Sequence, residues 1–181
     1  MGRNITLEQV IFFLLETPMF EDLDATELSE IVHIMKVQHV EQGASVFDEG
    51  DRGDAWYVLF DGQAVVTKST PFGPSQEVAI LKPHACFGEM AILDGSSRSA
   101  SVGARTDMTV FRFPRLLFLS LLDSNNLGAF KLVHGMAKVL CQRQRTLTQQ
   151  FSDLLEEVSD ADGGGSYGDL GALLDQVVIS E

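Results

Sequence analysis

The middle of the chain constrains the fold most, because residues 37–113 consist of short β-rich runs separated by turn residues. Glycines such as Gly43 and Gly50 and the pair Asp61-Gly62 mark the turns. Short strands at regular spacing with Gly-rich turns are typical of an antiparallel barrel or sandwich. The strands that we predict are Ser45–Phe47, Trp56–Phe60, Ala64–Thr67, Val78–Leu81, Ala100–Val102 and Thr109–Phe113.

Helical patterns precede this region, in residues 1–36. Thr6 and Gln9 have the spacing of a capping box, and so do Asp24 and Glu27. The second box is followed by apolar residues on one helical stripe. We therefore predict two short N-terminal helices in residues 1–36.

Helical patterns return in residues 114–159. We predict Pro114 at the first position of a short helix over Leu116–Leu122, then a long helix from about Leu127 to Val158. Apolar positions in the long helix recur mostly in steps of 3 and 4, which is a seam of coiled-coil type. They are Val133, Met136, Leu140, Leu147, Phe151, Leu154 and Val158.

Composition and charge exclude several classes of protein. The 181 residues are 45% hydrophobic and 22% charged, which suits one folded domain with an appendage and excludes wholesale disorder. The formal net charge of −13 argues against binding to nucleic acid or to an anionic membrane. Two cysteines, Cys86 and Cys141, favour a reducing compartment. With no apolar run near the ~20 residues of a membrane span and no signal-peptide pattern, we predict a cytoplasmic protein without membrane insertion.

The end of the chain differs in charge from the rest. Residues 146–181 hold 8 of the acidic residues and none of the basic ones. Residues 160–181 begin as a Gly- and Asp-rich linker and end in an amphipathic pattern. We predict a domain over residues 1–159 and a tethered tail over 160–181. The tail either docks on a partner, caps its own domain or is a frayed end; its apolar positions are Leu170, Leu173, Leu174, Val177 and Val178.

The residues that carry chemistry lie between 87 and 101, in the segments Phe87-Gly88-Glu89-Met90-Ala91 and Arg98-Ser99-Ala100. Gly88 allows a ligand to approach the backbone, and the N–H groups near Met90 and Ala91 can bind an anion. Arg98 can pair with a phosphate in bidentate fashion. Glu89 only accepts hydrogen bonds, so beside a phosphate it should face a sugar hydroxyl. These features describe a nucleotide site; the alternative is a surface turn with a Glu–Arg salt bridge.

Residues of about 8–145 resemble the cyclic-nucleotide-binding domain family, which includes the catabolite activator protein, kinase regulatory subunits and cyclic-nucleotide-gated channels. Residues 87–101 resemble the family's phosphate-binding cassette. The resemblance implies an α+β fold: an antiparallel β-roll of about eight strands with N-terminal helices and a long C-terminal helix. The segment Glu41–Val66 carries the family's turn glycines and an aromatic residue, namely Gly43, Gly50, Gly53, Tyr57 and Gly62.

The resemblance also implies roles for single residues. Gly88 and Glu89 would contact the ribose 2′-hydroxyl, while the backbone of Ala91 and the side chain of Arg98 would hold the cyclic phosphate, with Ser99 beside it. No catalytic residue, metal or cofactor is expected. The ligand-binding residues implied in the cassette are Phe87, Gly88, Glu89, Met90, Ala91, Arg98, Ser99 and Ala100.

The long helix has two expected roles. An ungapped count from Arg98 places Arg143 and Gln144 where relatives of the catabolite activator type reach the base. An arginine there can donate to guanine or stack over any purine; the alternative is a solvated polar stretch. The helix also resembles the family's dimerisation helix, which implies a parallel homodimer through Val133–Val158. The alternative is that it packs on its own domain.

One position departs from the family, because His84 stands where glycine is usual. If that position needs a positive φ, His84 carries strain. His84 and Cys86 also give the only hint of a metal or thiol site, and we expect a structural role instead.

We therefore expect a stand-alone receptor for a cyclic mononucleotide, with cAMP favoured over cGMP, that is not an enzyme. Residues 160–181 contain no Lys or Arg, so no DNA-binding domain is expected there. The signal would pass to an unknown protein effector through the C-terminal helix and tail. The alternative is a dimeric regulatory scaffold whose pocket is empty or binds another ligand, such as a cyclic dinucleotide.

Overall fold

The structure is a computed structural model that describes residues 5–70 and 73–161, and of residues 157–161 only the helical backbone. Beyond Ala161, the predicted linker and tail therefore lie outside the described residues. The chain divides into two compact units, Met1–Val139 and Leu140–Glu181. In chain order the elements are α1 (Leu7–Leu15), η1 (Pro18–Phe20), α2 (Ala25–His33), β1 (Lys36–Val40), β2 (Ser45–Phe47), β3 (Ala55–Asp61), β4 (Ala64–Thr70), β5 (Gly73–Leu81), β6 (Cys86–Phe87), α3 (Met90–Leu93), β7 (Ser101–Ala104), β8 (Met108–Pro114), α4 (Arg115–Asp123) and α5 (Leu127–Ala161).

The two predicted capping boxes are confirmed. Thr6 Oγ1 accepts a hydrogen bond from the Gln9 N–H at 3.3 Å, and the Gln9 side chain accepts from the Thr6 N–H at 3.0 Å. Asp24 and Glu27 form the second box at the start of α2. Each cap pairs backbone N–H groups that the helix itself leaves unpaired, which fixes where α1 and α2 begin.

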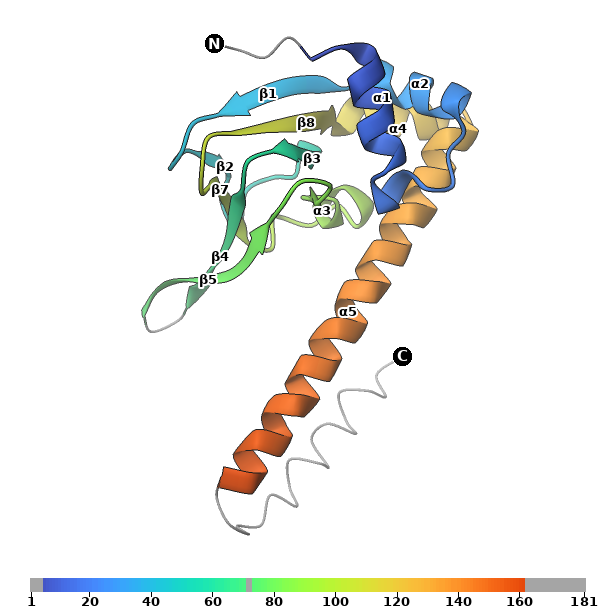
Figure 1. Cartoon of the computed structure of the whole chain (residues 1–181). Coiled ribbons are helices and arrows are strands. Elements are labelled where there is room, and N and C mark those ends of the chain that lie inside the picture. Colours follow the sequence, from blue (N-terminus) through green and yellow to red (C-terminus); the bar gives the residue numbers. More distant parts are fainter. Residues whose placement is uncertain (1–4, 71–72, 162–181) are drawn as a thin grey trace. The chain divides into compact units, whose positions relative to one another are not determined.

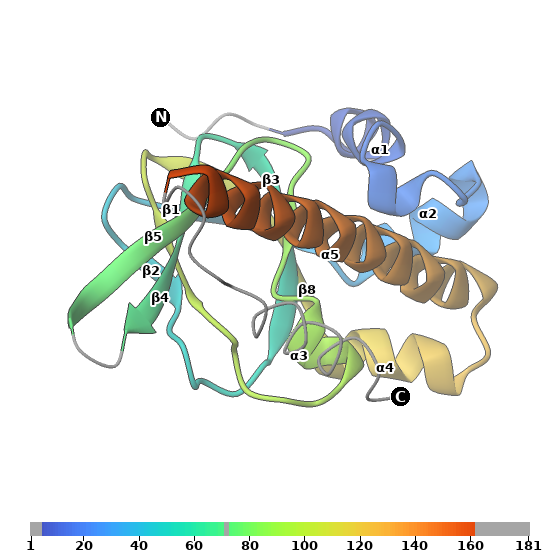
Figure 2. The same cartoon turned by 90° about the horizontal axis from the view of Figure 1, so that it is seen from below.

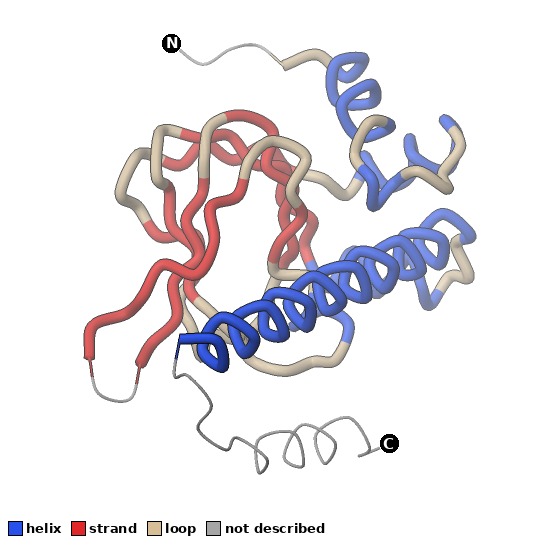
Figure 3. The backbone as a smooth tube through the Cα atoms, turned by 60° about the horizontal axis from the view of Figure 1, so that its bottom comes forward, coloured by secondary structure: helices blue, strands red, loops and turns tan. Residues whose placement is uncertain are grey.

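The β-rich region folds into the expected antiparallel β-roll, shown in red in Figure 3. One sheet has the strand order β1-β8-β3-β6 and the other β2-β7-β4-β5. β4 and β5 form a long hairpin that extends from the roll in both Figure 1 and Figure 2. The six predicted strands are present, and the structure adds β1 and β6. The eight-stranded α+β fold is confirmed.

Two apolar cores form on opposite faces of β3 and β8, because side chains alternate along a strand. On the helical side, Trp56 and Phe113 stack with ring centroids 4.0 Å apart, and Phe118 of α4 meets Trp56 edge-on. On the inner side, Tyr57 stacks on Phe87 of β6. The helical core fixes the first unit, and the inner core fixes the strands that carry the cassette.

The C-terminal helices differ from the prediction in two details. Pro114 ends β8 and is the N-cap of α4, not its first helical residue, because its ψ of 131° is extended. α5 continues to Ala161, so the first residues of the predicted linker are helical.

The helix α5 begins inside the core of the first unit. Met136 is fully buried there, and Val133 packs against the same core. These two positions of the predicted dimer seam therefore serve the domain itself.

No single helix in the described part of the chain is long and apolar enough to cross a membrane. Only α4 and α5 taken together reach that length and composition, and they are bent by 119° at the break between them. Phe118, Ala129, Leu132 and Met136 of this pair are buried in the core.

Candidate functional site

The cassette connects a strand to a short helix. β6 ends at Phe87, Gly88 follows with φ of 77°, and Glu89 is the N-cap of α3. The first helical bonds run from Ile92 and Leu93 to the Glu89 carbonyl, at 3.0 and 3.1 Å. The N–H groups of Met90 and Ala91 precede these bonds, so they stand at the open start of the turn, where an anion is favoured.

Gly88 is required both by its backbone and by its surroundings. A φ of 77° lies in the left-handed region that glycine adopts at little cost. A Cβ at this position would stand 2.7 Å from Nη1 of Arg98 and 3.3 Å from the ring of Phe47. The backbone at Gly88 therefore lies so close to Arg98 that only a residue without a side chain fits there.

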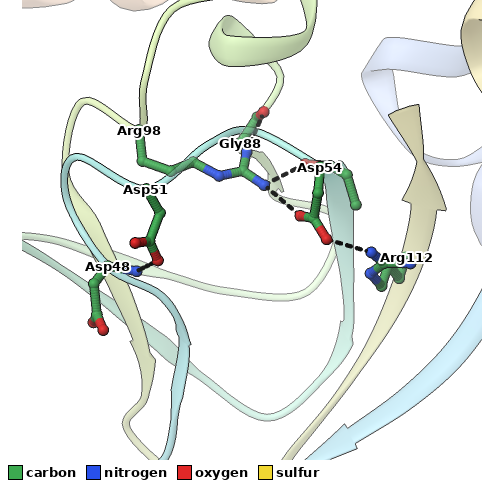
Figure 4. Close-up of polar contacts among 7 residues, drawn as sticks. Asp48, Asp51, Asp54, Gly88, Arg98 and Arg112 are labelled. Carbon is green, nitrogen blue, oxygen red and sulfur yellow. Dashed lines mark hydrogen bonds and ion pairs between the residues drawn. The ribbon is translucent and has the colours of Figure 1, made fainter. Parts of the chain in front are cut away.

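Arg98 is buried, with 1% of its side chain exposed, and is held from several sides (Figure 4). Its Nη1 donates to the Gly88 carbonyl at 2.8 Å, and its Nη2 donates to the Ala55 carbonyl at 2.7 Å and to Asp54 Oδ1 at 3.2 Å. Its guanidinium carbon lies 4.1 Å from the centroid of the Phe47 ring. The buried Nε has no hydrogen-bond partner among the described residues. A buried donor without a partner is costly, so this N–H is a candidate for binding a ligand.

Burial and neighbouring charges have opposite effects on the pKa of Arg98. Burial lowers the pKa of Arg98, while the neighbouring Tyr57, Asp54 and Asp51 act to raise it. Asp54 also accepts a hydrogen bond from Arg112 Nη2 at 2.6 Å. Burial raises the pKa of Tyr57, whose hydroxyl interacts with Arg112. One mostly exposed carboxylate therefore stands between two arginines.

The backbone around Arg98 is fixed by the loop between β2 and β3. The Gly50 N–H donates to the Arg98 carbonyl at 2.9 Å, and the Arg98 N–H donates to the Asp51 carbonyl at 2.8 Å. These two bonds set the direction in which the Arg98 side chain leaves the main chain.

The ion pair of Lys68 and Glu49 holds the residues that follow Arg98. Lys68 Nζ donates to the Ser99 carbonyl and to Glu49 Oε1, both at 2.6 Å. The Glu49 N–H donates to Ser101 Oγ at 2.9 Å. The hydrogen bond from Lys68 lowers the pKa of Glu49. The cassette is thus tied to β4 and to the β2–β3 loop by side chains as well as by backbone.

The cassette residues predicted from the sequence lie together. Phe87, Glu89, Ala91 and Arg98 are buried, Gly88 and Ala100 are half-buried, and Met90 and Ser99 are exposed. Ala91 packs closely on the β2–β3 loop, since a Cβ built at Gly53 would lie 2.5 Å from the Ala91 Cβ. Arg143 and Gln144 are exposed on α5 within the second unit, and their expected contact with a base stays a prediction.

Several residues of the site were not predicted. Phe47 ends the predicted strand Ser45–Phe47, Asp54 lies in the turn before the next strand, and Lys68 lies in β4, but nothing in the sequence marks them as site residues. Arg112 has a recognisable sequence signal, because it is a charged residue within the apolar strand Met108–Pro114. It lies two positions after Val110, on the strand face that points into the inner core.

His84 has the positive φ, 70°, that its place in the family pattern suggested. Its ring stacks on Phe13 with centroids 4.0 Å apart, and its Nδ1 lies 2.9 Å from Thr17 Oγ1. These contacts join the roll to the N-terminal helices, which supports the structural role. No group of three or more His, Cys, Asp or Glu side chains that could hold a metal ion occurs within the part of the chain that the structure describes.

Comparison with known proteins identifies the family. The family described as "Cyclic nucleotide-binding domain" matches residues 37–125, which include the whole cassette. Residues 37–125 of this chain belong to the cyclic nucleotide-binding domain family.

Individual relatives agree with this assignment. A cAMP-dependent protein kinase regulatory subunit from Yarrowia lipolytica is 41% identical over 98 residues, which cover 54% of this chain and 25% of the relative. The crystal structure of the Thermus thermophilus catabolite activator protein matches with a TM-score of 0.66 and 29% identity, over 77% of this chain and 63% of that one. The regulatory domain of Toxoplasma gondii PKA, solved with cAMP, matches with a TM-score of 0.62 and 26% identity, over 72% and 49%. The chain therefore spans a quarter of the length of the first of these relatives.

Proposed function

We propose that this protein is a receptor for a cyclic mononucleotide, with cAMP favoured over cGMP. The observation that carries the proposal is Arg98, buried and preoriented by two backbone carbonyls and a carboxylate, with a buried Nε–H that has no partner among the described residues. A phosphate accepts well from a guanidinium. The kinase regulatory subunits among the relatives, and the one solved with cAMP, favour cAMP.

The site acts by binding, not by conversion of the ligand. Gly88 and Glu89 would take the ribose 2′-hydroxyl, the Ala91 N–H and Arg98 the cyclic phosphate. Glu89 is buried beside this turn, and its carboxylate is a group that can accept a hydrogen bond from a sugar hydroxyl. Arg143 and Gln144 would meet the base and transmit binding along α5 to an effector protein, by shifting an equilibrium that exists without ligand.

Calorimetry with cAMP and cGMP tests the proposal. Arg98→Ala should weaken binding by about 3–5 kcal/mol, a hundredfold or more, because it leaves a buried phosphate without its counter-charge. Arg105→Ala is the matched control, since Arg105 pairs with Glu77 at the surface, outside the cassette. If the wild type binds neither nucleotide, or if Arg98→Ala binds as tightly as the wild type, the proposal is wrong.

Pairing of two copies through α5 is the second part of the proposal. Beyond the residues used by the core, Leu147, Phe151 and Leu154 lie on one helical face and are 60%, 48% and 58% exposed. Their spacing of 4 and 3 matches a coiled-coil seam. A dimer would cover this face, whereas an effector protein or the tail are the competing occupants.

Sedimentation analysis tests the dimer. Phe151→Glu should shift the protein toward the monomer. Ser152→Glu adds the same charge one residue on, away from the face of Leu147, Phe151 and Leu154, and should leave association unchanged. A wild type that sediments as a monomer at all concentrations contradicts the dimer. In that case the alternative of a dimeric scaffold is also excluded.

A further inference from the structure

The carboxylate of Asp54 is shared by two arginines, as Figure 4 shows. Its Oδ1 lies 3.2 Å from Nη2 of Arg98, and its Oδ2 lies 2.6 Å from Nη2 of Arg112. Charge-assisted hydrogen bonds are strong near 2.7–2.9 Å and weaken with distance. Asp54 is therefore bound mainly to Arg112 and only loosely to Arg98.

Arg112 is held where it can do this. It stands directly opposite Tyr57 in the pairing of β3 with β8, on the inner face of the roll. Burial pulls the pKa of Arg112 down, but hydrogen bonds to Tyr57 and Asp54 more than offset this, so its pKa is raised. Its side chain is 23% exposed, against 1% for Arg98 and 62% for Asp54. Arg112 is thus a fixed positive charge behind the Asp54 carboxylate.

The sharing decides how much positive charge Arg98 can offer to a ligand. Within the group of Arg98, Asp54 and Arg112, two guanidinium groups face one carboxylate and leave an excess of one positive charge. If Arg112 were absent, Asp54 would turn wholly to Arg98 and neutralise more of the guanidinium charge that an incoming anion needs. An unshielded carboxylate a few ångströms away would also repel the anion.

We propose that Arg112 is a positioning residue of this site, which draws Asp54 away from Arg98 and so keeps the Arg98 guanidinium available to the phosphate of the ligand. The inference rests on the proposed function, since it names the residue that sets the strength of the same phosphate site. Arg112 itself need not touch the ligand.

A double-mutant cycle tests this, with cAMP affinity measured by calorimetry. Arg112→Met should weaken cAMP binding by about tenfold, because the Asp54 charge is released toward Arg98. Asp54→Asn in the same protein should restore the affinity to within about threefold of the wild type, because the competing charge is gone. Arg112→Lys should bind nearly as well as the wild type, since it keeps the charge. Arg105→Met, at a surface pair outside the site, is the matched control and should change nothing.

A merely structural role for Arg112 gives the opposite result. Loss of both partners would then weaken binding at least as much as the loss of Arg112 alone. If Asp54→Asn fails to rescue Arg112→Met while urea unfolding shows that both variants are folded, the inference is wrong.

The inference and the proposed function fail in different ways. If Arg98→Ala abolishes cAMP binding but Arg112→Met does not weaken it, the receptor proposal stands and the role of Arg112 falls. If the wild type binds no nucleotide, titration with inorganic phosphate, followed by the Arg98 Nε–H resonance, still decides. The resonance should shift less in Arg112→Met than in the wild type and recover in the double variant; equal shifts in all three overturn the inference.

Discussion

Substitution of Gly88 by alanine separates the backbone requirement of the cassette from its role in holding Arg98. Gly88 and Gly43 share a left-handed backbone, with φ of 77° and 82°. A Cβ at Gly43 would meet nothing within 4 Å, whereas at Gly88 it would stand 2.7 Å from the Arg98 guanidinium. The two glycines thus share the backbone requirement but differ in the space around them, and Gly43→Ala is the matched control.

The magnitudes follow from these contacts. Either alanine costs about 1–2 kcal/mol of unfolding free energy, because an L-residue is strained in the left-handed region. Gly88→Ala also pushes Arg98 away, since ordinary contact begins near 3.4 Å and the atoms would stand at 2.7 Å. The displaced guanidinium loses its bond to the Gly88 carbonyl, and a hydrogen bond of a charged group contributes about 1.5–3 kcal/mol.

Urea unfolding and calorimetry together measure the two effects. Strain should lower the unfolding free energy of both variants by about 1–2 kcal/mol. In Gly88→Ala the lost hydrogen bond of Arg98 should lower it by about 1.5–3 kcal/mol more. Only Gly88→Ala should lose cAMP affinity, by about 10- to 100-fold, since 1.4 kcal/mol corresponds to a factor of ten. If Gly88→Ala matches Gly43→Ala in stability and keeps the wild-type affinity, the close approach of Gly88 to Arg98 has no functional weight and the reasoning is refuted.

Three further predictions concern the surroundings of the site. The hydrogen bond from Lys68 lowers the pKa of Glu49 from its usual 4.5, so the ionised carboxylate stabilises the cassette fully above pH 4.5. This contribution is lost as the pH falls through the lowered pKa. Hydrogen exchange at the Ser69 N–H, which donates to Glu49, should become faster over that range in the wild type but not in Glu49→Gln. Phe118→Ala should lower the unfolding free energy by about 3–5 kcal/mol in urea, and a smaller loss would contradict its burial in the core. His84→Gly removes about 1–2 kcal/mol of backbone strain, but it also removes a ring stack and a hydrogen bond that contribute about 1 kcal/mol each. The unfolding free energy, measured by thermal unfolding, should therefore change little. A large change in either direction contradicts this account.

Local signals predicted the elements whose cause is local. The capping residues Thr6 and Asp24 sit three positions before their partners, so the helix starts could be found from the sequence. The β1 strand could not, because Lys36–Val40 is an edge strand of its sheet and is mostly exposed, which leaves little apolar alternation. The β6 strand has two residues and exists only through its pairing with β3.

The site followed the same division. The cassette residues near Gly88 and Arg98 are close in sequence and carry a family pattern, so they could be predicted. Asp54 lies more than forty positions before Arg98, in a turn whose composition gives no sign of an ion pair. Partners of this kind are set by the tertiary fold, which brings the β2–β3 loop and β8 to the cassette.

The position of β8 has a consequence for how the domain is made. β8 pairs with β1 on one side and β3 on the other, joining Lys36 to Arg112 and Ala55 to Pro114. The β4–β5 hairpin can form as soon as it is synthesised, but β1 and β3 can be joined only after β8 is made. Folds dominated by such distant pairings form slowly. Until then β1 and β3 expose unpaired edges, which is the stage at which a nascent chain is most open to aggregation. Since β8 completes the sheet that carries β3 and β6, a ligand of the proposed site would stabilise the finished domain and would not guide its early folding.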